Sequence, residues 1–144
     1  EQLETLRKDP SAMRGAVEEI IRWSSPVAYF ARRATRDTEI RGVKIAKWDR
    51  VTHWYPSANR DEVVFQDPFR FDISRSPNPH IAFGGGGAHF CLGANLARRE
   101  IAILFEELLA RTKEIEILGP TQFSVLGIYN PILVVPQQIQ VRIA

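Results

Sequence analysis

The stretch FGGGGAHFCLGANLARREI, from Phe83 to Ile101, decides what this chain can fold into. Four consecutive glycines come shortly before His89, and Cys91, the only cysteine in the chain, follows two positions after that histidine. Beyond Gly93 apolar residues recur at helical spacing, at Ala94, Ala97, Ile101, Leu104, Phe105 and Leu108. A glycine-rich turn therefore leads through a cysteine into an amphipathic helix, whose predicted polar face carries Asn95, Arg98, Arg99, Glu106 and Glu107.

Composition narrows the class of protein. The 144 residues are enough for one domain, with 44% hydrophobic and 25% charged residues, as in ordinary globular proteins. A net charge of +2 is too small to indicate nucleic acid as a partner. The sequence has no apolar run of about 18 residues, so no membrane span is predicted. No secretory signal is visible. A single cysteine forms no internal disulfide, so we expect a reducing, cytoplasmic location. Because the chain begins at Glu1 rather than methionine, we expect a fragment or a processed product.

The rest of the chain predicts one further long helix and several strands. Asp9-Pro10-Ser11 has the pattern of a helix start, and the helical period that follows should end near Ser24-Ser25, before Pro26. Strands are predicted at VAYFARRAT (27–35) and RVTHWY (50–55), with a hairpin at TEIRGVKI (38–45) turning at Arg41-Gly42. Residues 56–79 predict an irregular segment without a persistent period, the meander. The tail predicts short strands joined at Asn130-Pro131 and Val135-Pro136.

Several interpretations of Cys91 are open from the residues alone. Glycines allow close approach to the backbone, and the helix start favours a thiolate over a thiol. Such a thiolate could ligate haem iron or act as a nucleophile with His89, although a base two residues away rarely reaches the sulfur. A phosphate loop is a third interpretation, but the Lys-Ser/Thr of a P-loop is absent. The remaining alternative is a buried, inert cysteine beside a glycine turn.

The loop and the helix together strongly resemble the haem-binding segment of the cytochrome P450 superfamily, in its bacterial soluble class. The resemblance implies that Cys91 is the proximal thiolate ligand of the iron and that His89 contacts a haem propionate. Phe83 and Gly84 open the matched loop, and Gly87 and Gly93 match the family glycines four residues before and two after the cysteine. Phe83 lies eight residues before Cys91 rather than the usual seven, which we interpret as a trait of a subgroup.

Two further motifs carry the resemblance. Glu19 and Arg22 match the family E-x-x-R pair, and DPFRFD (67–72) resembles its P-x-R-F motif with Arg70 as the arginine. In the family these three residues form a buried ion network that holds the meander beside the haem loop. From spacing alone, Glu19 and Arg22 are an exposed helix pair worth about 0.2–0.5 kcal/mol, and Glu18 could equally pair with Arg22.

The resemblance also implies roles for single residues outside these motifs. Arg32 matches the arginine that pairs with a haem propionate, while Arg33 should alternate to the other face of its strand. The alternative is that both arginines are solvated. His80 could approach the haem edge, but we expect it to cap the loop. Trp48 stands where many members carry a turn glycine, so we expect that turn to differ, because tryptophan tolerates positive φ badly. In the family the hairpin tip borders the substrate, here Leu126, Gly127, Ile128 and Tyr129, which could instead be ordinary sheet core.

The implied fold class is α+β: the C-terminal part of the mainly helical cytochrome P450 fold, with two long helices, a small antiparallel sheet, a meander and a cysteine haem loop. Residues 1–144 would form a single partial domain. The family's oxygen-activating helix is not in this sequence. We therefore expect the isolated chain to bind haem weakly or not at all, to be inactive, and to expose apolar surface that promotes self-association.

The predicted function is that of a haem-thiolate monooxygenase. Haem b, O₂ and two electrons from a redox partner would hydroxylate a lipophilic small molecule, with sterol side chains and branched lipids as candidates. Arg98 and Arg99 would dock an acidic ferredoxin-type donor, or simply form a solvated helix face. The alternatives are a non-catalytic truncated remnant and, more remotely, a cysteine-dependent hydrolase.

Overall fold

The computed structural model describes residues 1–126 and 132–143. Its helices are α1 (Gln2–Lys8), the 3₁₀ helix η1 (Pro10–Ala12), α2 (Met13–Ser24), α3 (Tyr55–Ala58) and α4 (Ala94–Arg111). Its strands are β1 (Val27–Arg33), β2 (Thr38–Ile40), β3 (Val43–Ile45), β4 (Arg50–Trp54), β5 (Ile115–Ile117), β6 (Gln122–Leu126), β7 (Ile132–Gln138) and β8 (Val141–Ile143).

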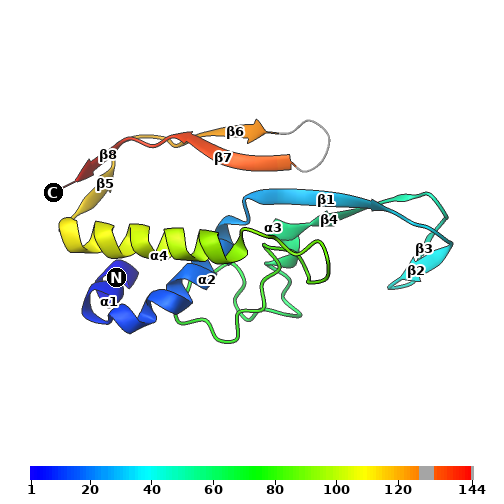
Figure 1. The fold of residues 1–144 in the computed structure, drawn as a ribbon, viewed down its shortest axis with the longest axis horizontal. Helices are drawn as coiled ribbons and strands as arrows, with labels where there is room; N and C mark the ends of the chain where they lie inside the picture. Colours follow the sequence, from blue (N-terminus) through cyan, green and yellow to red (C-terminus); the bar gives the residue numbers. More distant parts are fainter. Residues whose placement is uncertain (127–131, 144) are drawn as a thin grey trace.

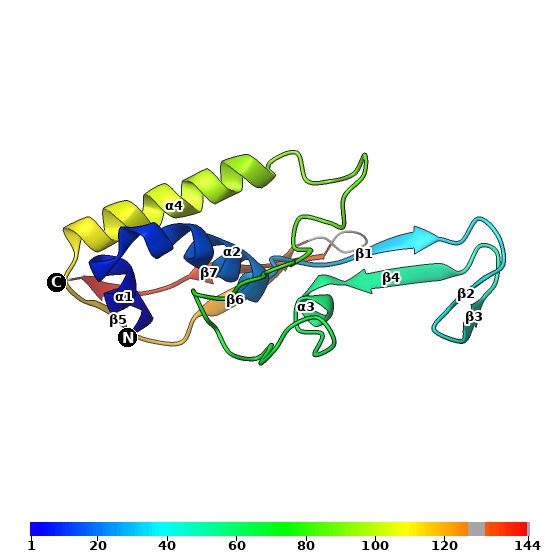
Figure 2. The same cartoon turned by 90° about the horizontal axis from the view of Figure 1, so that it is seen from below.

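The helices α1, α2 and α4 gather at one end of the molecule, whereas strands run along its whole length (Figures 1 and 2). The helices α1, α2 and α4 pack together at the end that holds both termini, and the β2–β3 hairpin lies at the opposite end (Figures 1 and 2). One antiparallel sheet, in the order β4-β1-β7-β6, lies between these ends, and two-stranded β2–β3 and β5–β8 sheets complete the fold. The predicted α+β class, with two long helices and a small antiparallel sheet, is confirmed.

The helix predicted after Asp9 forms, with a 3₁₀ opening. The Asp9 side chain accepts a hydrogen bond from the Ser11 N–H at 3.0 Å, and η1 begins at Pro10. The helix α2 ends at Ser24, where Ser25 takes a left-handed conformation with φ of 36° ahead of Pro26. The capping residue and the proline therefore set the two ends as the sequence predicted. The helix α1 was not predicted.

The hairpin predicted at residues 38–45 forms, with its turn at Arg41-Gly42. In β2–β3, Ile40 pairs with Val43 across Arg41 and Gly42, whose φ values are 49° and 82°. Two consecutive positive φ angles are typical of the tight turns that suit twisted hairpins. The β1 strand pairs instead with β4, and Arg32 lies opposite Val51 in that register.

The prediction that the turn at Trp48 must differ is wrong. Trp48 takes the positive φ of 78° that glycine would favour. The turn is held because the Asp49 N–H donates to the Ala46 carbonyl at 3.0 Å and the Asp49 carboxylate accepts from the Ala46 N–H at 2.8 Å. The Lys47 ammonium lies 5.2 Å from the centre of the Trp48 ring. These contacts offset the strain of a left-handed tryptophan.

The tail differs from its prediction at one proline. The strand β7 runs through Val135-Pro136 without a break, and Pro136 pairs with Phe123 beside an irregularity in the register. Irregular register is a position where a strand tolerates proline, which has no N–H to donate. Asn130-Pro131 and the tip residues Gly127, Ile128 and Tyr129 lie outside the described residues, and Leu126 ends β6.

The core lies between α2 and α4. Met13, Val17 and Ile21 of α2 form a buried cluster with Ala82, and the α4 residues Ile101, Ala102, Phe105 and Leu109 pack against it. Leu104, predicted to face the core, is 60% exposed, because the face of α4 that meets α2 lies to one side of it. Leu92 and Leu96 are also exposed. The expected exposed apolar surface is therefore present along the start and middle of α4.

Candidate functional site

The glycine loop between Phe83 and Gly93 folds back on itself. Gly84, Gly86 and Gly87 take φ values of 95°, 96° and 80°, which side-chain-bearing residues rarely adopt. The Cys91 N–H donates to the Phe83 carbonyl at 3.0 Å and so closes the loop. Cys91 is exposed, which excludes the interpretation of a buried, inert thiol.

Cys91 lines one cavity together with both predicted propionate partners. The cavity has a volume of about 770 Å³ and is lined by Ile21, Ser24, Pro26, Val27, Phe30, Arg32, Tyr55, Ala82, Phe83, His89, Cys91, Ala97 and Ile101. Arg33, next to Arg32 on β1, does not line it and donates instead to the Trp48 carbonyl at 3.3 Å. The alternation predicted for the two arginines is therefore present.

The residues that line this cavity fit a haem group. A thiol stands ready as a soft ligand, two side chains offer cationic or hydrogen-bonding contacts for carboxylates, and most remaining walls are apolar. The positive φ of Gly87 explains a glycine there, and a Cβ on Gly84 would lie 4.0 Å from the His89 carbonyl oxygen. A Cβ on Gly93 would lie at an ordinary 3.9 Å from the Cys91 sulfur, so the described neighbours do not require glycine at that position.

A buried ion network attaches the meander to α2. The Arg22 guanidinium donates to both oxygens of Glu19, at 2.7 and 2.8 Å, and both side chains are fully buried. Arg22 also donates to the carbonyls of Asn59 and Pro68. The pair is thus a bidentate, fully satisfied one, unlike the exposed helix pair that spacing alone suggests.

The third arginine of the network is Arg75, and the prediction of Arg70 is wrong. The Arg75 Nε donates to Glu19 Oε2 at 3.2 Å, whereas Arg70 contributes only its carbonyl, which accepts from Arg22 and Arg75. Asp72 explains the placement, because its carboxylate accepts from the N–H and hydroxyl of Ser74 and turns the chain back toward α2. That Asp-x-Ser pattern is the sequence signal that could have favoured Arg75.

The environment of Glu19 keeps it ionised. Burial by itself raises the pKa of this carboxyl, but the hydrogen bonds from Arg22 and from the Asp72 N–H outweigh burial, and the pKa lies below its usual value. Asn78 adds a third kind of donor, from Nδ2 to Glu19 Oε2 at 3.1 Å. The meander is therefore attached to α2 through one carboxylate.

Asn59 and His80 were not assigned to the site and connect the meander to the loop. Asn59 is fully buried, accepts from the Ile81 N–H and donates to the Ser25 hydroxyl. His80 accepts from the Ala82 N–H and bonds to Glu18, so it caps the loop as predicted. A buried asparagine in an irregular segment has no distinctive spacing, and the sequence offered no signal for Asn59.

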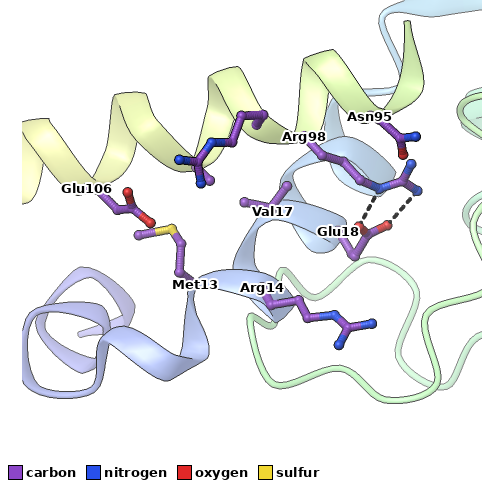
Figure 3. Close-up of a pocket in the computed structure, with 9 residues that line it drawn as sticks. Met13, Arg14, Val17, Glu18, Asn95, Arg98 and Glu106 are labelled. Atoms are coloured by element: carbon purple, nitrogen blue, oxygen red, sulfur yellow. Dashed lines mark hydrogen bonds and ion pairs between the residues drawn. The ribbon is translucent and has the colours of Figure 1, made fainter. Parts of the chain in front are cut away.

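The two arginines predicted to dock an electron donor differ. Arg98 donates twice to Glu18, at 2.6 and 3.1 Å, and its side chain is one-third exposed. The bond to Glu18 raises the pKa of Arg98. Arg99 is exposed. Both side chains line a groove of about 670 Å³ between α2 and α4 (Figure 3).

Comparison with known proteins decides the family. The family model for cytochrome P450 matches residues 7–116. This chain belongs to the cytochrome P450 family. A cytochrome P450 uses haem, and here the matched region contains the loop, the ion network and the cavity. Within the described residues, no helix is long and apolar enough to cross a membrane.

Curated P450 relatives are similar over most of the chain. A methyl-branched lipid omega-hydroxylase of Mycobacterium bovis is 66% identical over 93 residues, covering 65% of this chain and 22% of that protein. A steroid C26-monooxygenase of the same organism is 59% identical over 90 residues, covering 62% of this chain and 21% of that protein. The chain thus spans about a fifth of the length of these relatives.

A solved P450 structure has the same fold over almost the whole chain. The complex of P450BioI with an acyl carrier protein ligated to hexadec-9Z-enoic acid superposes with a TM-score of 0.90 at 36% identity. The match covers 99% of this chain and 36% of that one. The cytochrome P450 architecture expected from the motifs is therefore confirmed.

Proposed function

We propose that this chain supplies the thiolate side of a haem-thiolate monooxygenase. The observation that carries the proposal is the single cavity in which the exposed Cys91 thiol lies together with Arg32 and His89. Cys91 would ligate the iron of haem b, and Arg32 and His89 would hold its two propionates. When bound, haem would supply an iron centre for O₂ chemistry, in which two electrons from a redox partner and two protons are consumed, one oxygen atom enters a substrate C–H bond and the other becomes water.

The residues of this chain would bind and orient the group. The apolar side chains of Phe30, Val27 and Ile101 would exclude water from the cavity that holds the group. The α4 helix begins three residues after Cys91, and its positive end favours the anionic form of a ligand there. The ion network of Glu19, Arg22 and Arg75 would keep the meander in place beside this pocket.

The proposed substrate is a lipophilic small molecule, with branched lipids and sterol side chains as the first candidates. The support is the similarity to a methyl-branched lipid omega-hydroxylase and a steroid C26-monooxygenase. A spectral titration of the haem-loaded intact enzyme with both compound classes tests this proposal. Absence of any shift with either class would remove both candidates.

The proposed electron donor is an acidic ferredoxin-type protein that docks near Arg99. Arg98 is engaged with Glu18, so Arg99 is the exposed cation of the predicted pair. In the intact enzyme, reversing the charge with Arg99→Glu should slow electron transfer at low salt and weaken its salt dependence. An unchanged and still salt-dependent rate would reject docking at this residue.

The first test of the haem site is an absorption spectrum. The protein is mixed with haem, reduced and exposed to carbon monoxide, beside a Cys91→Ser control. A strongly red-shifted Soret band in the parent, absent from the control, would support Cys91 as the iron ligand. A Soret band that is identical in both proteins would reject Cys91 as the ligand. Absence of haem uptake by this chain would favour the alternative of a non-catalytic piece.

A further inference from the structure

The groove between α2 and α4 contains a carboxylate that links three segments. Glu18 extends from α2 toward Arg98 of α4, and Figure 3 shows the two bonds between them. The same carboxylate bonds to His80 in the segment before the glycine loop, with 2.9 Å between Glu18 Oε2 and His80 Nε2. One half-buried side chain thus receives three hydrogen bonds from two partners.

The histidine is held in one orientation by its second nitrogen. Its Nδ1 accepts from the Ala82 N–H at 3.3 Å, so Nε2 carries the hydrogen that is donated to Glu18. The His80 side chain is only 2% exposed. Because Ala82 directly precedes Phe83, this contact fixes the chain just where the loop begins.

Arg98, the other partner of Glu18, also lies next to the start of the glycine loop. The Arg98 guanidinium carbon lies 4.7 Å from the centre of the Phe83 ring, and the His80 ring lies 6.1 Å from it. The carbonyl of Phe83 in turn accepts from the Cys91 N–H at 3.0 Å. Both partners of Glu18 therefore contact the residue whose backbone holds the cysteine.

We propose that Glu18 is a positioning residue for the thiolate loop, acting through His80 and Arg98 on Phe83 and thereby on Cys91. This role rests on the proposed function only as far as the iron ligand is concerned. The carboxylate must be ionised, because all three bonds that it receives come from donors. Burial raises the pKa of Glu18, but the bonds from Arg98 and His80 prevail and lower it.

The test uses Glu18→Gln, because the amide has the same shape but offers one acceptor oxygen instead of two. One of the donors of Arg98 or His80 then faces an NH₂ group. Hydrogen exchange at the Cys91 amide reports directly on its bond to Phe83, with the Trp48 amide as a distant reference, since its bond to the Ala34 carbonyl lies in another part of the fold. We expect protection at Cys91 to fall about tenfold while that at Trp48 is unchanged.

Glu106→Gln is the matched control. Glu106 lines the same groove and is exposed, and no hydrogen bond or ion pair of its side chain is recorded among the described residues. It should leave both amides unchanged. A second variant, Arg98→Lys, keeps the charge but loses the planar fork and its stacking on Phe83, and should lower protection at Cys91 in the same direction. An unchanged Cys91 amide in Glu18→Gln, or an equal loss at Cys91 and Trp48, would overturn the proposal.

The haem-loaded protein gives an independent readout. With carbon monoxide, Glu18→Gln should lose the red-shifted Soret band several-fold faster on standing than the parent and the Glu106→Gln control. If the parent itself shows no red-shifted band, the proposed haem function fails, and the amide exchange alone decides the positioning role. A different outcome is that the band decays equally in all three proteins while protection of the Cys91 amide falls in Glu18→Gln. Glu18 would then position the loop backbone only, which overturns its role in thiolate ligation.

Discussion

The meander and the glycine loop are both irregular segments, but they are held in different ways. The meander is attached to α2 through a fully buried carboxylate, Glu19, and the side chains that surround it. Within the glycine loop, the conformation is set by three positive φ angles and by backbone hydrogen bonds from Cys91 to Phe83 and from Phe90 to Gly87. Charge therefore fixes the scaffold, whereas the loop leaves its thiol exposed and available to a ligand.

Two neighbouring carboxylates on α2 repeat this contrast. Glu19 has no exposed side-chain surface, while the side chain of Glu18 is 27% exposed. Glu19 bonds to the meander, and Glu18 bonds to the segment that leads into the loop and to α4. A single helix thus positions both irregular segments through consecutive residues that point to different sides.

The largest expected effect is that of removing the buried charge. Glu19→Gln should lower the free energy of unfolding by about 3–5 kcal/mol, because it leaves Arg22 as an uncompensated buried cation. Urea unfolding measures this loss. The matched control is Glu107→Gln, which breaks the exposed pair with Arg111 and should cost about 0.5 kcal/mol or less. Equal losses of unfolding free energy in Glu19→Gln and Glu107→Gln would mean that the buried network stabilises the fold no more than the exposed pair.

The next effect distinguishes the two arginines of the meander. Arg75→Ala should cost about 2 kcal/mol or more, since Arg75 bonds to Glu19 and to the carbonyls of Gln66 and Asp67. Arg70→Ala should cost about 0.5 kcal/mol or less, because its side chain is exposed and only its carbonyl is used. Thermal or urea unfolding of both variants decides the order. A larger loss for Arg70→Ala would restore the original assignment.

Acid should weaken the meander through Glu19. Its folded pKa is lowered, so its stabilisation is complete above the unfolded pKa of about 4.3 and is lost as the pH falls through the folded pKa. Arg75 is one of the charges that lower it. The difference in unfolding free energy between the parent and Arg75→Ala should therefore shrink over the acid range, as the pH falls from about 4.3 through the folded pKa. A difference that stays constant over this range would contradict the link.

The smallest effect concerns the glycine loop. Gly87→Ala should cost about 1–2 kcal/mol, because alanine is strained at φ of 80°. Gly85→Ala is the control, since no positive φ or close neighbour is found at that position. Unfolding free energy and haem affinity measure both variants, and we expect only Gly87→Ala to weaken haem binding. Equal behaviour would show that loop conformation does not depend on the positive φ.

The sequence predicted most of what depends on local patterns. The helix start at Asp9, the turn at Arg41-Gly42, the long helix after Gly93 and the loop cysteine all follow from capping, turn chemistry and periodicity. The Trp48 turn escaped prediction because its φ is imposed by contacts with Asp49, Ala46 and Lys47 rather than by the residue itself. The sequence predicted a break at Val135-Pro136, but β7 is continuous because Pro136 lies beside an irregularity in the register, where a strand tolerates proline.

By itself, the sequence determined the family, the cysteine and the residues that could meet it in one pocket. Only the tertiary structure decided that Arg75 rather than Arg70 joins Glu19, and that Arg98 pairs with Glu18 instead of standing free. The physical reason is the same in both cases. Sequence spacing fixes which residue types are present, but burial and the three-dimensional path of an irregular segment fix which charge meets which carboxylate.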